Sequence, residues 1–128
     1  KLINNQNIKN LCHFSNEDID VTEVLFTCDI LVSSSNYESF PMIVCEAMSS
    51  GIPCVVTNVG DCAKIVADTG IIIEKGDTKA IAKELKKLVA MDRFNRINIG
   101  QQARLRIKNL FSEELMIKNY SITYKNYI

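Results

Sequence analysis

Short, largely apolar runs recur along the first two thirds of the chain, each followed by small, polar or turn-forming residues. The firmest are residues 30–32, Cys54–Thr57 and Ile71–Ile73. Continuous apolar runs of this length are typical of parallel strands that are buried on both faces. A further strand is expected over residues 8–14, ahead of a polar, turn-rich stretch at 15–20. The pattern therefore predicts four short strands.

Helical patterns lie between these runs. A weak helix is expected over residues 21–28, and a firmer one over residues 41–50. The second has Pro41 near its start and Gly51 just past its end. Proline at the first turn and glycine after the last are common helix boundaries, so this helix is well delimited by the sequence.

The chain after residue 76 is predicted to be helical throughout. Asp77 or Thr78 is placed to cap a helix whose apolar residues recur at i, i+4, i+7 and i+8. Two more helices are expected, over residues 92–109 and 112–128. The predicted apolar stripe of the first of these three helices consists of Ile81, Leu85, Leu88 and Val89.

Strands that alternate with helices predict an α/β fold, a Rossmann-like three-layer sandwich with a mostly parallel sheet. The chain has 128 residues, of which 47% are hydrophobic, so we assign residues 1–128 to a single domain. A domain of this size buries enough surface to fold without a metal or a disulfide. The first residue is lysine and the opening segment resembles a helix end, so we expect a fragment of a longer protein.

The 15 basic and 15 acidic side chains cancel, which argues against nucleic acid as the main partner. The distribution is uneven, because residues 92–128 carry 7 basic and 3 acidic side chains. A solvated helix face is the expected role of this basic segment. Peripheral contact with anionic lipid, or contact with a partner domain, is the alternative.

Five cysteines occur without the spacing of a metal site, and a single histidine, His13, accompanies them. Several cysteines lie in apolar runs, which indicates a reducing, cytoplasmic location and no bound metal. Cys62 follows a predicted loop, so we expect it to be the most exposed of the five. His13 is assigned to packing or to the surface.

In parallel sheets, ligands bind beyond the carboxyl ends of the strands. Of the loops at 33–40, 58–61 and 74–77, only the first is rich in chemistry. It contains Glu38, and Glu46 lies eight positions later within the predicted helix. Two carboxylates so placed can accept hydrogen bonds from the hydroxyl groups of a sugar or a ribose.

The start of the same helix offers a phosphate site. Its first backbone N–H groups, those of Phe40, Met42, Ile43 and Val44, lack intrahelical acceptors and lie at the positive end of the helix dipole. Sugar, ribose and phosphate together indicate a nucleotide sugar. By themselves, two glutamates eight residues apart more often have no binding role. The first then stabilises the helix start through the helix dipole, and the second lies on the solvated face of the helix.

The surrounding motif is more specific than the two glutamates. The chain has SNYESFP at 35–41, EAMSSGIP at 46–53 and VVTNVG at 55–60. These segments resemble the C-terminal domain of the GT-B glycosyltransferases of family 4, which are retaining enzymes with a Glu-x7-Glu motif. Ser34 stands where that family usually has proline, and Ser39 where glycine is more frequent.

The resemblance implies roles for individual residues. Glu38 would lie against the donor sugar and help to stabilise developing positive charge, as the catalytic residue, and Glu46 would accept hydrogen bonds from the donor ribose. Gly60 would lie in a loop that faces the interdomain cleft. The loop and helix start that would surround the sugar and the diphosphate comprise Ser39, Phe40, Pro41, Met42 and Ile43. Ala47, Met48, Val55 and Val56 are expected in the core.

The resemblance also implies a function, namely the donor-binding part of a retaining enzyme that transfers a hexose from a UDP or GDP sugar. The acceptor would be a glycan or a lipid-linked molecule, and no cofactor or metal is expected. The basic residues that neutralise the leaving diphosphate, and the N-terminal acceptor domain, would lie outside this chain, so the fragment is expected to be inactive.

A non-catalytic α/β binding or interaction module derived from the same fold is the alternative function. The expected location is cytoplasmic, with peripheral contact at the inner face of a membrane as a further option. An exposed edge strand or apolar patch would also permit the fragment to self-associate.

Overall fold

A computed structural model describes residues 8–14 and 19–127. Its sheet contains three parallel strands in the order β1-β2-β3, which are β1 (Leu31–Ser33), β2 (Cys54–Thr57) and β3 (Ile71–Ile73). Val55 in the central strand is paired with Val32 on one side and with Ile71 on the other. The parallel sheet predicted from the apolar runs is therefore present.

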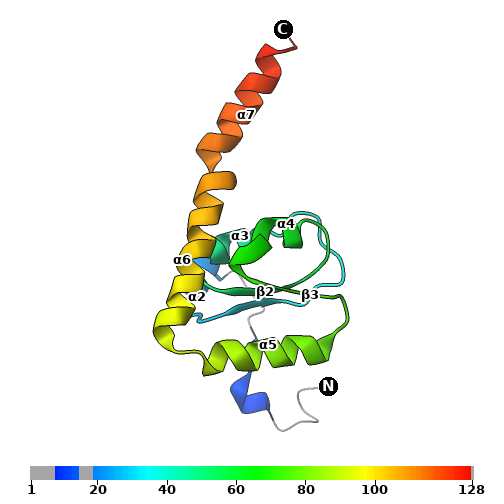
Figure 1. The fold of residues 1–128 in the computed structure, drawn as a ribbon, viewed down its shortest axis with the longest axis vertical. Helices are drawn as coiled ribbons and strands as arrows, with labels where there is room; N and C mark the ends of the chain where they lie inside the picture. The colour runs from blue at the N-terminus through cyan, green and yellow to red at the C-terminus, as the bar shows by residue number, and fades with distance from the viewer. Residues whose placement is uncertain (1–7, 15–18, 128) are drawn as a thin grey trace.

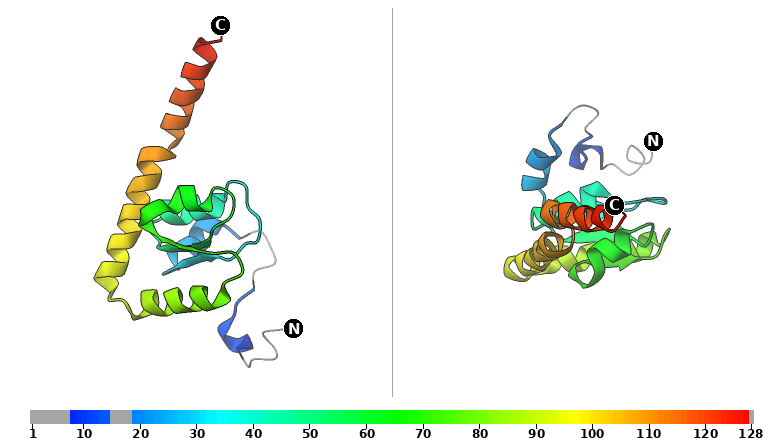
Figure 2. Two further views of the ribbon diagram at one scale, coloured as in Figure 1. Left: turned by 45° about the vertical axis from the view of Figure 1, so that its right-hand side comes forward. Right: turned by 90° about the horizontal axis from the view of Figure 1, so that it is seen from above.

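Helices cover both faces of this sheet and make three layers (Figures 1 and 2). Helix α3 (Met42–Ser49) and helix α4 (Cys62–Val66) pack on one face, and α5 (Thr78–Ala90) lies along the other. Each strand is followed in the chain by one of these helices, as expected for a parallel sheet that is covered on both faces. The predicted α/β class and three-layer architecture are confirmed.

The core is divided by the alternation of side chains along β2. Cys54 and Val56 join a cluster with α3 and α4, while Val55 joins Ile73 and Leu88 beneath α5. All four residues of β2 are buried, because helices lie on both sides of the strand. The predicted core residues Ala47, Met48, Val55 and Val56 are each at most 1% exposed.

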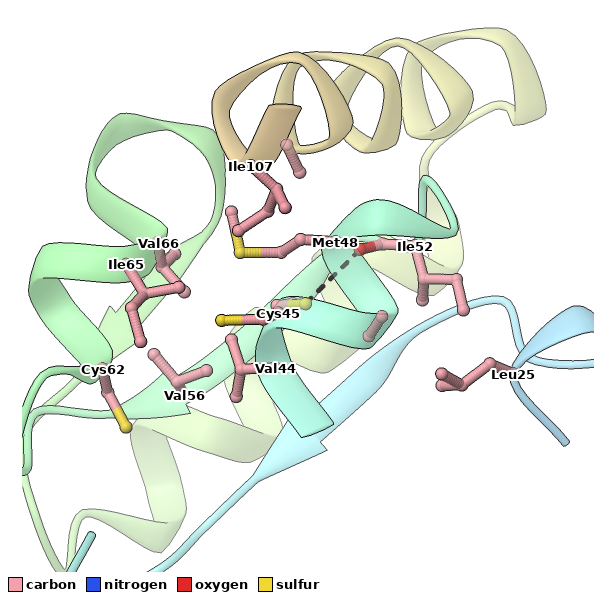
Figure 3. Packing of buried hydrophobic residues seen from close by; sticks show 13 residues of the cluster. Leu25, Val44, Cys45, Met48, Ile52, Val56, Cys62, Ile65, Val66 and Ile107 are labelled. Atoms are coloured by element: carbon pink, nitrogen blue, oxygen red, sulfur yellow. Dashed lines mark hydrogen bonds between the residues drawn. The ribbon is translucent and has the colours of Figure 1, made fainter. Parts of the chain in front are cut away.

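Helix α6 (Arg93–Leu110) is fastened to the end of α3 at a contact between two glycines. A Cβ atom on Gly100 would lie 1.8 Å from the carbonyl oxygen of Gly51, which itself has φ +76°. Ala103 and Ile107, one and two turns further along α6, enter the core. Figure 3 shows Met48 of α3 pointing toward Ile107.

Helix α7 (Glu113–Lys125) continues beyond α6 and projects from the body of the molecule (Figure 1). It has no buried residue, and the stacked rings of Tyr120 and Tyr124 are 60% and 64% exposed. Ser112 caps its start by accepting a hydrogen bond from Leu115 N at 3.3 Å. Among the described residues, no helix is long and apolar enough to cross a membrane.

The prediction of a strand over residues 8–14 is wrong. A short 3-10 helix, η1 (Lys9–Leu11), lies there instead, and Leu11 and Phe14 are 80% and 70% exposed. A strand needs a partner for its backbone N–H and C=O groups, and the described sheet pairs only β1, β2 and β3. An apolar run without a neighbouring strand or an apolar cover does not form a strand.

Other boundaries differ by one to three residues. The weak helix is α2 (Val21–Phe26), shorter than predicted. Helix α4 and the 3-10 helix η2 (Ala67–Thr69) were not predicted, since five- and three-residue helices carry too little apolar periodicity. Val89, assigned to the apolar stripe of α5, is 70% exposed, so Leu88 alone of that pair is buried. Residues 15–18 of the predicted turn, and residue 128 of the last helix, lie outside the described residues.

Candidate functional site

The loop after β1 is organised by a chain of two hydrogen bonds that starts in the core. Thr57, the last residue of β2, donates from Oγ1 to the carbonyl oxygen of Ser35 at 2.6 Å. Ser35 in turn donates from Oγ to Oε1 of Glu38 at 2.7 Å. The side chain of Glu38, which is half-buried, is therefore oriented by a hydroxyl of its own loop.

The loop after β2 packs directly against the backbone of the same segment. Gly60 has φ +51°, and a Cβ atom there would lie 2.2 Å from the carbonyl oxygen of Glu38. Asp61 N donates to the carbonyl oxygen of Ser39 at 3.0 Å. Glycine is needed at position 60 both for its backbone conformation and for this close approach. The carboxyl ends of β1 and β2 thus form one joined site.

Helix α3 begins at this site without a side-chain cap. Pro41 is its N-cap residue, and no side chain accepts a hydrogen bond from the first turn. The N–H groups of Met42 and Ile43 have no acceptor in the part of the chain that the structure describes. The N–H of Val44 donates to Pro41 O at 3.1 Å, so the sequence-based expectation that it would be free is wrong.

Glu46 lies on the solvent-facing side of α3. Its neighbours at i−4 and i−3, Met42 and Ile43, are exposed on the same face of the helix. Glu46 has no hydrogen-bond or ion-pair partner among residues 8–14 and 19–127. Two unengaged N–H groups therefore point out of the start of α3, and an unengaged carboxylate lies on its exposed face about one turn further along.

Comparison with known proteins identifies the family. The model of the family described as "Glycosyl transferases group 1" matches residues 1–106. The chain belongs to this glycosyltransferase family.

Relatives with assigned roles agree with this membership. The chain is 31% identical over 126 residues to an N-acetyl-alpha-D-glucosaminyl L-malate synthase of Bacillus anthracis, a match that covers 97% of this chain and 33% of the relative. It is 32% identical over 102 residues to the capsular polysaccharide biosynthesis glycosyltransferase CapM of Staphylococcus aureus, covering 78% of this chain and 27% of CapM. The chain spans about a third of the length of these relatives.

The fold matches solved glycosyltransferases of the GT-B class. The sucrose-phosphate synthase of Thermosynechococcus elongatus superimposes with a TM-score of 0.90 at 24% identity, over 98% of this chain and 32% of the synthase. At that identity the likeness concerns the fold. It confirms the fold class predicted from the motif.

The predicted site residues of this glycosyltransferase domain divide into three groups. Glu38, Ser39 and Gly60 are in contact where the two loops meet. Ile43 and Glu46 lie on the open face of α3, and Pro41 is buried beneath the start of that helix. Phe40 and Met42 line a separate cavity.

That cavity, of about 480 Å³, lies between the start of α3 on one side and the junction of α6 with α7, together with one face of α7, on the other. The ring of Phe40 lies 6.1 Å, centroid to centroid, from the ring of Phe111 in that junction. The side chain of Phe40 therefore anchors the site loop to α6, while its backbone remains in the loop.

The loop at 74–77, after the third strand, also reaches the site, although only the loop at 33–40 was predicted from the sequence to be rich in chemistry. Asn58 Nδ2 donates to Glu74 Oε1 at 3.2 Å, and Lys75 Nζ lies 3.9 Å above the ring centroid of Tyr37. Tyr37 is 85% exposed, so the cation stabilises an otherwise free aromatic ring at the rim of the loop.

Cys62 is buried, with no exposed surface, so the prediction that it is the most exposed cysteine is wrong. It lies at the start of α4 and points into the core, whereas Cys28 is exposed. Burial, followed by the nearby charge of Glu38, raises the pKa of the Cys62 thiol. A neutral, enclosed thiol has no nucleophilic role here.

No group of three or more His, Cys, Asp or Glu side chains that could hold a metal ion occurs in the described part of the chain. His13 is exposed, in agreement with its assignment to the surface. Of the acidic residues here, Glu38 and Glu46 are the two predicted from the sequence, and each can accept hydrogen bonds from hydroxyl groups.

Proposed function

We propose that this chain is the donor-binding part of a retaining glycosyltransferase that transfers a hexose from a UDP or GDP sugar to a glycan or a lipid-linked acceptor. Membership of the glycosyltransferase group 1 family supports the enzyme class. The observation that carries the proposal is the juxtaposition of an oriented carboxylate, Glu38, with the uncapped start of α3.

The start of α3 suits the diphosphate of the donor. The N–H groups of Met42 and Ile43 are unengaged, and the helix dipole places roughly half a positive charge there. No acidic side chain occurs in the first turn to compete with an anion. Glu46, one turn further along the open face, is placed to accept hydrogen bonds from the hydroxyl groups of the ribose.

Glu38 suits the sugar. Ser35 engages its Oε1, while its Oε2 has no hydrogen-bond partner among the described residues. In the transfer, the bond between the anomeric carbon and the diphosphate oxygen breaks, a bond to the acceptor oxygen forms, and the proton of the acceptor hydroxyl passes to the leaving diphosphate. Positive charge develops on the sugar as the nucleoside diphosphate leaves, and a fixed carboxylate stabilises that charge in the transition state.

The rest of the reaction requires groups beyond these residues. The chain spans about a third of its relatives, and we propose that the remainder supplies the acceptor site and the basic residues for the leaving diphosphate. The isolated chain is then expected to be inactive. The names of the N-acetyl-alpha-D-glucosaminyl L-malate synthase and of CapM state an N-acetylglucosaminyl product and capsular polysaccharide biosynthesis, and both support sugar transfer. We place this transfer in the cytoplasm, with peripheral membrane contact as an option.

The proposal is tested by kinetics on the full-length protein that contains this chain. A panel of UDP-N-acetylglucosamine, UDP-glucose, UDP-galactose and GDP-mannose, with L-malate or a glycan as acceptor, identifies the donor by release of UDP or GDP. Glu46→Gln is expected to raise the donor KM about tenfold, as for a lost hydrogen bond to a charged group. Glu38→Gln is expected to lower kcat about 100-fold, as for a lost electrostatic stabiliser.

Glu23→Gln on the exposed face of α2 is the matched control, and its constants should stay within about twofold of the parent's. Parent-like kinetics in both site variants would remove the assignment of the donor site. Turnover of no donor by a folded parent protein would favour the non-catalytic module instead.

A further inference from the structure

We infer that Thr57 and Ser35 are positioning residues that hold the carboxylate of Glu38 in its working orientation. This inference rests on the proposed function, because it assigns to two further residues the task of orienting the group that acts on the donor sugar. Neither residue belongs to the pair of glutamates on which that function depends.

Thr57 is the first part of the argument. It ends the central strand, is 1% exposed, and follows Val55 and Val56 in an otherwise apolar run. Valine would fill the same volume at this position without burying a hydroxyl group. A buried hydroxyl is tolerated only when it is hydrogen-bonded, so the hydroxyl of Thr57 has a specific structural use.

That use is to hold the first turn of the site loop. The Oγ1 of Thr57 lies 2.6 Å from Ser35 O and 3.4 Å from Ser33 O, and a hydroxyl has one proton to donate. The shorter contact has normal hydrogen-bond geometry, whereas the longer one is marginal. Thr57 therefore fixes the backbone of Ser35, which lies two residues beyond the end of β1.

Ser35 passes this constraint to the carboxylate. Its carbonyl accepts from Thr57 and its hydroxyl donates to Glu38 Oε1 at 2.7 Å, which is a charge-assisted hydrogen bond. The backbone of Glu38 is held separately by Gly60, against which its carbonyl oxygen packs. Both the backbone and the side chain of Glu38 are thus set by β2 and the loop that follows it.

The chemical consequence is preorganisation. A carboxylate that stabilises a developing positive charge is most effective when it does not have to reorient during the reaction. Without the hydroxyl of Ser35 the carboxylate could rotate, and without that of Thr57 the loop carrying it could shift. Losing either should slow the chemical step while leaving donor binding by α3 and Glu46 nearly unchanged.

The test uses steady-state kinetics of the full-length protein with the donor that gives the highest turnover in the panel above. Ser35→Ala removes the hydroxyl group that donates a hydrogen bond to Glu38. Thr57→Val removes the buried hydroxyl without changing the shape of the side chain. Thr57→Ser restores the hydroxyl. Thr69→Val is the matched control, because the Thr69 hydroxyl also donates to a backbone carbonyl, Val66 O at 2.7 Å, away from this loop.

Ser35→Ala and Thr57→Val are each expected to lower kcat about tenfold and to change the donor KM by less than about twofold. Thr57→Ser and Thr69→Val are expected to keep kcat within about twofold of the parent's. In a protein that already carries Glu38→Gln, Ser35→Ala should have almost no further effect, because the group that it orients is gone.

A merely structural role would show a different pattern. If Ser35→Ala lowers kcat by the same factor in the parent and in the Glu38→Gln variant, the inference is overturned. The same holds if both single variants retain the parent kcat while Glu38→Gln loses activity. Parent-like activity of Glu38→Gln itself would instead overturn the proposed function and this inference with it. Circular dichroism establishes that each variant is folded, and Ser35→Ala in the half-buried loop decides the question if Thr57→Val does not fold.

Discussion

Helices α3 and α7 are formed in opposite ways. The eight residues of α3 have no side-chain cap and no acidic residue in the first turn, yet four of them are buried against the sheet, α4 and α6. The 13 residues of α7 have a Ser112 cap and two acidic residues in the first turn, but none of them is buried. Packing against the core holds α3 in place, whereas α7 has favourable local interactions at its start and no buried residue.

This difference bears on function. Because tertiary packing stabilises α3, its start does not need a cap, and the N–H groups of Met42 and Ile43 remain available for a ligand. At the start of α7, Ser112 accepts from Leu115 N, and the carboxylates of Glu113 and Glu114 place negative charge beside the remaining N–H groups, which disfavours an anion there. A binding helix can leave its first turn unsatisfied only if its other contacts keep it in position.

The largest expected effect is on the free energy of unfolding when one side chain is truncated in each of the two helices. Met48→Ala in α3 is expected to lower the free energy of unfolding by about 2–5 kcal/mol, since Met48 has no exposed surface and its loss leaves a cavity. Tyr120→Ala in α7 is expected to change it by less than about 0.5 kcal/mol. Urea unfolding followed by circular dichroism measures both, and similar losses would show that α7 is packed as tightly as α3.

A smaller effect concerns the thiol of Cys54, in the buried cluster that α3 helps to form. Burial, followed by the effect of Cys45, raises its pKa to about 12 from the usual 9.0. A raised pKa stabilises the folded state fully below pH 9, and this contribution is lost as the pH rises from 9 toward 12, because the unfolded thiol ionises first.

The free energy of unfolding, measured with urea, should therefore fall between about pH 8 and about pH 10 in the parent protein. The fall should be smaller in Cys54→Ala. The exposed Cys28 gives the matched control, and Cys28→Ala should lose as much stability as the parent. Equal losses in all three proteins would contradict the assignment of the shift to Cys54.

The smallest effect is at the start of α7. Ser112→Ala removes the cap and is expected to destabilise that helix by about 1 kcal/mol, which increases fraying. Faster amide hydrogen exchange confined to Glu113–Lys125 is the predicted result, with little change in the midpoint of unfolding of the sheet. Ser121→Ala, a change within the same helix that leaves the cap intact, should not accelerate exchange. A global loss of stability in Ser112→Ala would mean that α7 is part of the core.

Much of the fold was predictable because its signals are local. The strands β2 and β3 follow from apolar runs, and α3 was delimited to within a residue at each end by Pro41 and Gly51. Glu38, Glu46 and Gly60 were identified from the motif, and the structure brings Glu38 and Gly60 into contact. Whether Glu38 and Glu46 act on a donor remains a prediction.

What was missed depends on contacts between distant residues. The hydroxyl of Thr57 reaches Ser35 across 22 positions, and nothing in the sequence near Thr57 distinguishes it from a core residue. The burial of Cys62 follows from α4, whose five residues give no helical period. The exposed segment at 8–14 is apolar enough for a strand but has no described neighbour with which to pair.

The most direct test of the donor site is a crystal structure of the full-length protein with UDP or GDP, whichever nucleotide the donor screen selects. The predicted result places the diphosphate at the N–H groups of Met42 and Ile43, with the carboxylate of Glu46 within hydrogen-bond distance of the ribose hydroxyls. A nucleotide bound away from the start of α3, or a Glu46 carboxylate that does not contact it, would contradict the central claim.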